Sequence, residues 1–231
     1  MNIKLCPKAF FLKNLYIMCF LLFANILGIV ATYYFDLVSG LIILFDFNSE
    51  RNIPTLYSSV ALVFSSILLA AIAFESKKLN WPYISWLGLS LIFLFLSVDE
   101  MASIHESLVF PVRKFFGASG FLYYSWVIPY GVVLVFFIIA YSKFLFQLPK
   151  RTMILFLISG SIFVLGAIGF ELLGGKQAHL YGTNNILYSI FYTCEEFLEM
   201  FGIAIFIYTL LTYMVNQFDG VVISITRSKD G

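Results

Sequence analysis

WPYISWLGLSLIFLFLSVDE, residues 81–100, is an apolar run closed by two acids. An α-helix needs about 20 residues, at a rise of roughly 1.5 Å each, to cross the hydrocarbon of a bilayer. The run is therefore long enough to span a membrane, and Asp99 and Glu100 lie where such a helix would leave it. Because carboxylates in hydrocarbon are costly, acids at this position indicate a functional site.

The composition of the whole chain agrees with this interpretation. Hydrophobic residues make up 61% of the 231 residues and charged residues only 12%. Such a chain cannot cover itself with a soluble surface, so we expect an integral membrane protein, with residues 1–231 forming a single transmembrane domain. The formal net charge is +1 and no dense basic tract is present, so we expect no binding to nucleic acid.

Five further apolar runs are long enough to span. The sequence therefore predicts an all-α polytopic bundle of six transmembrane helices, near residues 15–35, 56–74, 81–98, 121–141, 153–173 and 186–213. We expect the third helix to continue beyond the membrane through His105 towards Val109, until Pro111 stops it.

Basic residues predict the orientation of the bundle. With the N-terminus inside, the cytoplasmic segments carry ten Lys and Arg residues and the opposite segments carry four. Positive charge favours the cytoplasmic side, so we expect both termini in the cytoplasm. The first run lacks a small-residue cleavage site and is interpreted as a retained anchor. The expected location is a bacterial inner membrane.

The acids of three helices fall at one depth. Asp99, Glu171 and Glu195 each lie 18 or 19 residues from the cytoplasmic end of their span. At about 1.5 Å per residue they stand about 27 Å from that boundary, near the extracytoplasmic edge of the hydrocarbon. Glu199 lies about 6 Å deeper by the same rise. The sequence thus predicts one carboxylate-rich site facing the extracytoplasmic side.

Helical phase indicates which acids point together. Asp99, Ser103 and Glu106 share one helical stripe, as do Glu195, Glu199 and Gly202, while Glu171 shares a third with Gly160 and Ala167. Small residues mark faces packed on other helices, so each stripe is expected to face the bundle interior. Glu100 and His105 leave the first stripe in opposite directions, so both can join the site only if the helix bends or unwinds.

A divalent metal is the first hypothesis for what offsets these charges. The candidate ligands are Asp99, His105, Glu106, Glu171, Glu196 and Glu199, with His179 as a further histidine. The spacing from Glu196 to Glu199 resembles half of a carboxylate di-metal bundle motif, with Glu in place of His. Oxygen-rich ligation favours Mg²⁺, Ca²⁺ or Mn²⁺, and a histidine would admit Zn²⁺ or iron.

If the metal is catalytic, it would activate water or polarise a lipid-linked ester or phosphate. Glu100 or Glu195 is then the candidate general base. The expected partners are membrane lipid and a lipid-linked or small-molecule substrate. The loop around Asp46–Glu50 alternates oxygen side chains, but Arg51 occupies the position where a calcium loop requires Gly, so we interpret it as a solvated outer loop.

Two other hypotheses remain open. In a proton- or cation-coupled transporter, the acids would carry the coupling ion, although the middle of every span is apolar. In a structural or assembly protein, one or two of the acids would be protonated and the rest would pair with the four basic residues expected on the same side, which are Arg51, Arg113, Lys114 and Lys176.

Two short motifs carry a resemblance. They are Asp99-Glu100, followed after four residues by His105-Glu106, and Glu195-Glu196 followed by Glu199. The chain resembles a group of uncharacterised bacterial multispanning membrane proteins, over about residues 52–213. The resemblance implies a multispanning fold and a carboxylate layer that acts as a unit, and it implies no activity.

Overall fold

The computed structural model describes residues 6–218, and in this range the protein consists of helices joined by loops, with no β-strand. The predicted all-α class is confirmed, as are six helices long and apolar enough to cross a membrane. They are α1 (Pro7–Phe35), α3 (Ile53–Lys78), α4 (Ile84–Ala102), α7 (Val127–Gln147), a continuous helical segment over residues 150–181, and α10 (Ile186–Phe218).

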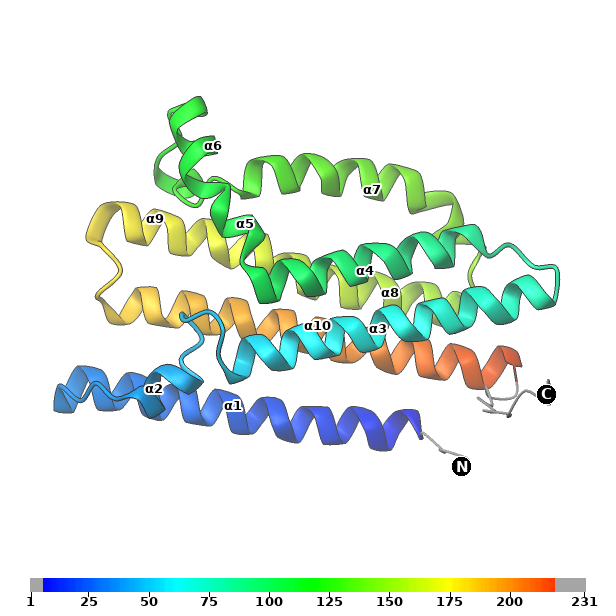
Figure 1. Cartoon of the computed structure of the whole chain (residues 1–231), viewed down its shortest axis with the longest axis horizontal. Helices are drawn as coiled ribbons and strands as arrows, with labels where there is room; N and C mark the ends of the chain where they lie inside the picture. Colours follow the sequence, from blue (N-terminus) through cyan, green and yellow to red (C-terminus); the bar gives the residue numbers. More distant parts are fainter. Residues whose placement is uncertain (1–5, 219–231) are drawn as a thin grey trace, which may run out of the picture.

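Helix α10 lies at the centre of the bundle, between α3 and α8 and beside α1 (Figure 1). Its inner face carries Ile207 and Leu210, which are fully buried against Leu69 and Ile72 of α3. Large apolar side chains on α1 and α7 are exposed instead, as expected where helices face lipid. Helix α1 begins and α10 ends at the same end of the bundle (Figure 1).

Serine pairs hold α3 against α4. The hydroxyls of Ser59 and Ser97 lie 2.9 Å apart, and those of Ser66 and Ser90 lie 3.1 Å apart; all four serines are buried. Each of the four hydroxyls also lies within hydrogen-bond distance of the backbone carbonyl of the paired serine, to which it can donate. Small polar residues let two membrane helices approach closely and bond to one another. These pairs fix the position of α4, whose end carries part of the acidic site.

The predicted continuation of the third helix through His105 is wrong. Helix α4 stops at Ala102, because Ser103 takes a left-handed conformation (φ 52°) and the chain turns into α5 (Ile104–Ser107) and α6 (Val109–Phe116). The carboxylate of Asp99 accepts a bond from the backbone N–H of His105, which replaces the helical pattern there. Pro111 falls in the first turn of α6, where a missing N–H costs nothing.

The fifth span is continuous but not uniform. It consists of α8 (Lys150–Val164), a π-helical turn η2 (Leu165–Phe170) and α9 (Glu171–Tyr181). The wider π turn changes the helical phase between Gly160 and Glu171, so the predicted common stripe is wrong. Gly160 has open space where a Cβ would lie, whereas a Cβ on Gly166 would come 2.7 Å from the backbone oxygen of Glu195. Gly166 is the residue that allows close packing.

The remaining elements are short and lie at one end of the bundle (Figure 1). They are α2 (Gly40–Phe45), α5, α6 and the 3₁₀ turn η1 (Gly120–Leu122). The same end holds the start of α7, the end of α4 and the first half of α10 (Figure 1). We call it the acidic end, because it carries Glu50, Asp99, Glu100, Glu106, Glu171, Glu195, Glu196 and Glu199.

Candidate functional site

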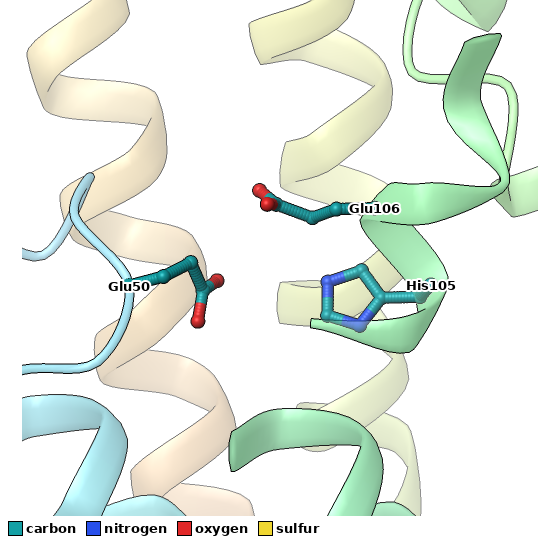
Figure 2. A group of neighbouring side chains, drawn as sticks. All are labelled: Glu50, His105 and Glu106. Atoms are coloured by element: carbon teal, nitrogen blue, oxygen red, sulfur yellow. The ribbon is translucent and has the colours of Figure 1, made fainter. Parts of the chain in front are cut away.

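Three side chains at the acidic end converge on one point. Glu50 comes from the loop before α3, and His105 and Glu106 come from α5. Each offers one ligand atom, and these atoms all lie within 4.8 Å of one another. Figure 2 shows His105 and Glu106 extending from the same segment towards the carboxyl group of Glu50, which lies on the opposite side of the gap. We call these three residues the triad.

The loop that carries Glu50 is fixed by its own side chains. Asp46 accepts a hydrogen bond from the backbone N–H of Asn48 at 3.0 Å and another from the Ser49 hydroxyl at 3.1 Å. The Asn52 amide donates to the backbone oxygen of Asp46 at 2.6 Å, and its oxygen caps α3 at the N–H of Thr55. Asx-type bonds of this kind set a turn without regular structure. The interpretation of a solvated loop is therefore wrong for Glu50, whose Oε2 is buried.

His105 is held in place by Asp99. The Nδ1 of its ring lies 3.3 Å from Asp99 Oδ1, and the ring packs on Trp126 with the centroids 4.8 Å apart. The other carboxylate oxygen of Asp99 accepts from the Tyr130 hydroxyl at 3.0 Å. With Nδ1 engaged, Nε2 is the nitrogen that remains for the triad, as in the carboxylate–histidine pairs of metal sites.

Charge sets the ionisation of these two residues. Burial by itself would lower the pKa of His105, but the bond to the Asp99 carboxylate and nearby acids outweigh it and raise this pKa to about 9. Burial, followed by the nearby charge of Glu106, raises the pKa of Glu50 above its usual value. A positive charge close to Glu50 would therefore stabilise its anionic form.

Two polar atoms beside the triad lack partners. Glu50 Oε2 and Ser103 Oγ are both buried, and neither makes a hydrogen bond of good geometry among residues 6–218, although the two side chains lie close to each other. An unsatisfied buried polar group costs about 1–3 kcal/mol, so such groups call for an explanation. A cation, or water bound to one, would satisfy the orphaned carboxylate oxygen.

A second set of acids lies deeper in the bundle. These inner carboxylates are Glu100 of α4, Glu171 of α9, and Glu195, Glu196 and Glu199 of α10. Glu171 accepts from the indole nitrogen of Trp126 at 2.6 Å and lies against Glu195. Glu196 neighbours both Glu100 and Glu199. The close approach of the π turn to α10 at Gly166 places Glu171 in this set.

Basic side chains do not neutralise these acids in the described part of the chain. The two ion pairs between residues 6 and 218 are His105 with Asp99, and Lys78 with Glu75 at the far end of α3. Arg113 instead donates to the Tyr123 carbonyl at 2.7 Å, and Lys176 lies over the Phe121 ring. Pairing with the basic residues, as the structural hypothesis requires, is not how the acids are arranged.

The predicted ligands divide into three places. His105 and Glu106 belong to the triad, Asp99 stands behind His105, and the other three are inner carboxylates: Glu171, Glu196 and Glu199. The candidate bases Glu100 and Glu195 are inner carboxylates as well. The second histidine, His179, is exposed on α9 and packs against the Tyr123 ring.

Glu50 is the member that sequence reasoning missed. A signal was available, because the loop between the first two predicted spans lies on the same side of the membrane as the acid layer. The break at Ser103 also brings Glu100 and His105 to the same site, since both lie close to Glu50 and to each other.

The chain belongs to the family described as a domain of unknown function (DUF8692), whose model matches residues 14–214. The matched range contains the triad and all of the inner carboxylates. No curated protein and no solved structure matches the chain.

Proposed function

We propose that this integral membrane protein binds a divalent cation at Glu50, His105 and Glu106, on the extracytoplasmic side of a bacterial inner membrane. The cation serves chemistry on a lipid or lipid-linked substrate. The observation that carries the proposal is the convergence of three ligand atoms within 4.8 Å, one of them from Glu50, whose Oε2 is buried and makes no hydrogen bond of good geometry.

Bond lengths and donor types narrow the choice of ion. Three ligand atoms that each lie about 2.1 Å from a tetrahedral zinc ion are about 3.4 Å apart, whereas the longer bonds of calcium allow three ligand atoms to be up to about 4.3 Å apart. The triad atoms lie within 4.8 Å of one another, so they need to close less on calcium than on zinc. Because one ligand is an imidazole, the donor set favours Zn²⁺, Fe²⁺ or Mn²⁺ over Mg²⁺ and Ca²⁺.

The neighbouring residues supply what a hydrolytic site needs. A bound divalent ion activates water or polarises an ester or phosphate oxygen. Asp99 orients His105, and Glu100, which neighbours both Glu50 and His105, is the candidate general base. Glu195, in contact with Glu171, is the second candidate. Glu106 is exposed, so a headgroup at the membrane surface can reach the triad.

Metal content tests the proposal directly. The protein is purified in detergent without chelators, supplied with each of the five ions in turn, and measured by elemental mass spectrometry. We expect one stoichiometric ion in the wild type, lost in Glu50→Gln and in His105→Gln. Glu75→Gln is the matched control, since Glu75 is paired with Lys78 at the opposite end of α3. A wild-type protein that binds none of the ions would refute the metal site.

A second measurement addresses the chemistry. The metal-loaded protein is incubated with bilayers of phospholipid and of lipid-linked phosphate, and the lipids are analysed by mass spectrometry. We expect cleaved or transferred headgroups with the wild type and none with Glu100→Gln or Glu195→Gln, at unchanged metal content. If the protein binds metal but converts no lipid, the enzymatic part of the proposal is refuted and the protein is a metal-binding protein.

Transport by the inner carboxylates is the second candidate, favoured by the absence of basic partners for them between residues 6 and 218. After Glu199, however, α10 continues with buried apolar residues such as Met200 and Ile203, which offer no polar path for an ion. Proton or cation flux in proteoliposomes that is abolished by Glu199→Gln would favour this candidate. If the protein binds no metal and carries no flux, and if substituting the acids changes only its thermal stability, a structural role is favoured.

A further inference from the structure

The described part of the chain contains a cavity beside the triad but separate from it. The cavity holds about 120 Å³ and lies between α1, α2, the loop that carries Asp46, and the start of α10. A water molecule needs about 10–15 Å³ on the same measure, so the space admits a group of several heavy atoms. None of the triad residues lines it.

The polar side chains at the floor of the cavity already have hydrogen-bond partners, which makes this floor rigid. Asn25 is 2% exposed, donates to the Thr193 hydroxyl at 2.9 Å and accepts from the backbone N–H of Phe47 at 3.0 Å. Ser189 is also buried and lies 3.3 Å from the Tyr33 hydroxyl. These bonds hold α1, the loop and α10 in register, so the cavity is kept open by the fold itself.

Asp46 is the one charged residue in the lining. Its carboxylate accepts from neutral donors, the N–H of Asn48 and the hydroxyl of Ser49, and makes no ion pair within residues 6–218. The Tyr192 hydroxyl lies next to it. A carboxylate in the wall of a cavity, without a cation, favours a positively charged guest.

The rest of the lining selects the kind of cation. Tyr33 and Tyr192 also line the cavity, and aromatic rings attract organic cations. Ile29 and Ile42 form an apolar wall that suits methylene groups. A metal ion would require several converging oxygen ligands at about 2.3–2.6 Å, and Asp46 is the lone carboxylate here.

We propose that this cavity binds an organic ammonium group, with Asp46 as the counter-ion and the two tyrosine rings beside it. The group comes either from the headgroup of an aminophospholipid or from a small free amine. The proposal uses residues outside the triad and does not depend on the proposed metal chemistry.

Binding of a free amine is tested with the full-length protein in nanodiscs made of lipids that contain no amine. Ethanolamine is titrated in and binding is followed by ligand-observed NMR, with ethylene glycol as the neutral probe of similar size. We expect ethanolamine to bind and ethylene glycol not to bind. Asp46→Asn, which keeps an oxygen to accept from Asn48, should weaken ethanolamine binding by about tenfold or more.

The lipid source is tested by native mass spectrometry. Protein from nanodiscs containing equal amounts of phosphatidylethanolamine and phosphatidylglycerol should retain phosphatidylethanolamine in preference, and Asp46→Asn should lose that preference. Retained lipid with no binding of free ethanolamine identifies the headgroup as the guest, and the reverse identifies a free amine. Both outcomes support the ammonium site.

A second variant guards against a folding defect. Asn48 lines the cavity and is exposed, so Asn48→Lys should fold and place its own ammonium group next to Asp46. We expect it to block ethanolamine and lipid alike, whereas His105→Gln should bind both as the wild type does. Failure of the wild type to bind either amine, or unchanged binding in Asp46→Asn and Asn48→Lys, would overturn the proposal.

Discussion

A single oxygen, Oδ1 of Asp99, meets His105 at two points: it accepts from the backbone N–H at 2.8 Å and lies 3.3 Å from Nδ1 of the ring. The first contact ends the regular helix and starts α5. The second turns Nε2 towards Glu50 and Glu106 (Figure 2). One side chain therefore sets both the course of the chain and the orientation of the histidine.

Replacing this carboxylate should weaken the proposed metal site without removing a ligand. Asp99→Asn keeps an oxygen for the backbone N–H of His105 but loses the charge that orients the imidazole. We expect the metal affinity to fall by about 10–100-fold, the usual effect of changing such a partner. Metal titration by calorimetry measures it, and Tyr130→Phe, which removes one bond to Asp99 Oδ2, should have a smaller effect. Equal affinity in Asp99→Asn and wild type would contradict this role.

The stability of metal-free protein should fall in alkaline solution. The pKa of His105 is raised to about 9 in the folded protein, so its imidazolium stabilises the fold. This contribution is complete below the unfolded pKa of about 6.5 and is lost as the pH rises through about 9. The groups that face His105 are Asp99, Glu50, Glu100, Glu106 and Glu199.

Thermal melts of chelator-treated protein in detergent, compared at pH 6.5 and pH 9.5, measure the effect. A shift from 6.5 to about 9 corresponds to a free energy on the order of 3 kcal/mol. His105→Gln should remove most of the difference between the two pH values, since the acids titrate in both proteins. A wild-type difference no larger than that of His105→Gln would show that the imidazolium does not stabilise the fold.

Closing the space at Gly166 should displace the inner carboxylates. A Cβ there would lie 2.7 Å from the backbone oxygen of Glu195 and 3.1 Å from the Glu199 side chain. Gly166→Ala must therefore push the π turn away from α10. Overpacking of this kind costs about 1–3 kcal/mol. Gly160→Ala is the matched control in the same span, because nothing lies within 4 Å of its Cβ.

Thermal stability in detergent compares the two glycine variants. We expect a lower melting temperature for Gly166→Ala and an unchanged or slightly higher one for Gly160→Ala, since alanine favours the helix. The same loss in both variants would mean that the whole span, rather than the contact with Glu195, is sensitive to substitution.

Removing the indole of Trp126 should leave Glu171 without its donor. Trp126 is 7% exposed, and its Nε1 lies 2.6 Å from Glu171 Oε1. Trp126→Phe keeps most of the packing on His105 but strands a buried carboxyl, which costs about 1–3 kcal/mol. Trp81→Phe, at an exposed tryptophan, serves as the control. Chemical denaturation followed by tryptophan fluorescence measures both, and equal stability would show that the bond is dispensable.

Hydrophobicity predicted the bundle because each span is a long apolar run with few charges, which has no other stable environment. The break at Ser103 could not be found this way, since it depends on Asp99 competing for a backbone N–H two residues beyond the turn. The predicted stripe from Gly160 to Glu171 was also wrong, because it assumes 3.6 residues per turn throughout the span and η2 departs from this value.

The part of the site that lies on the membrane-spanning helices was predicted from the depth of each residue along its helix. Depth placed Glu171 and Glu195 in one layer, and the structure puts them in contact. Glu50 was missed because a loop residue has no depth or phase to count. Its position follows from the bonds of Asp46 and Asn52, which become visible only once the two ends of the loop are placed.

The π turn also has a genetic consequence. A π turn takes up one residue more than a regular α-helix does over the same rotation, so deleting one residue from Leu165–Phe170 would restore regular winding and leave everything after it on the same face. Glu171 would then still face Glu195. The turn thus has the form expected of a single codon inserted into a regular helix and accommodated without turning Glu171 towards lipid.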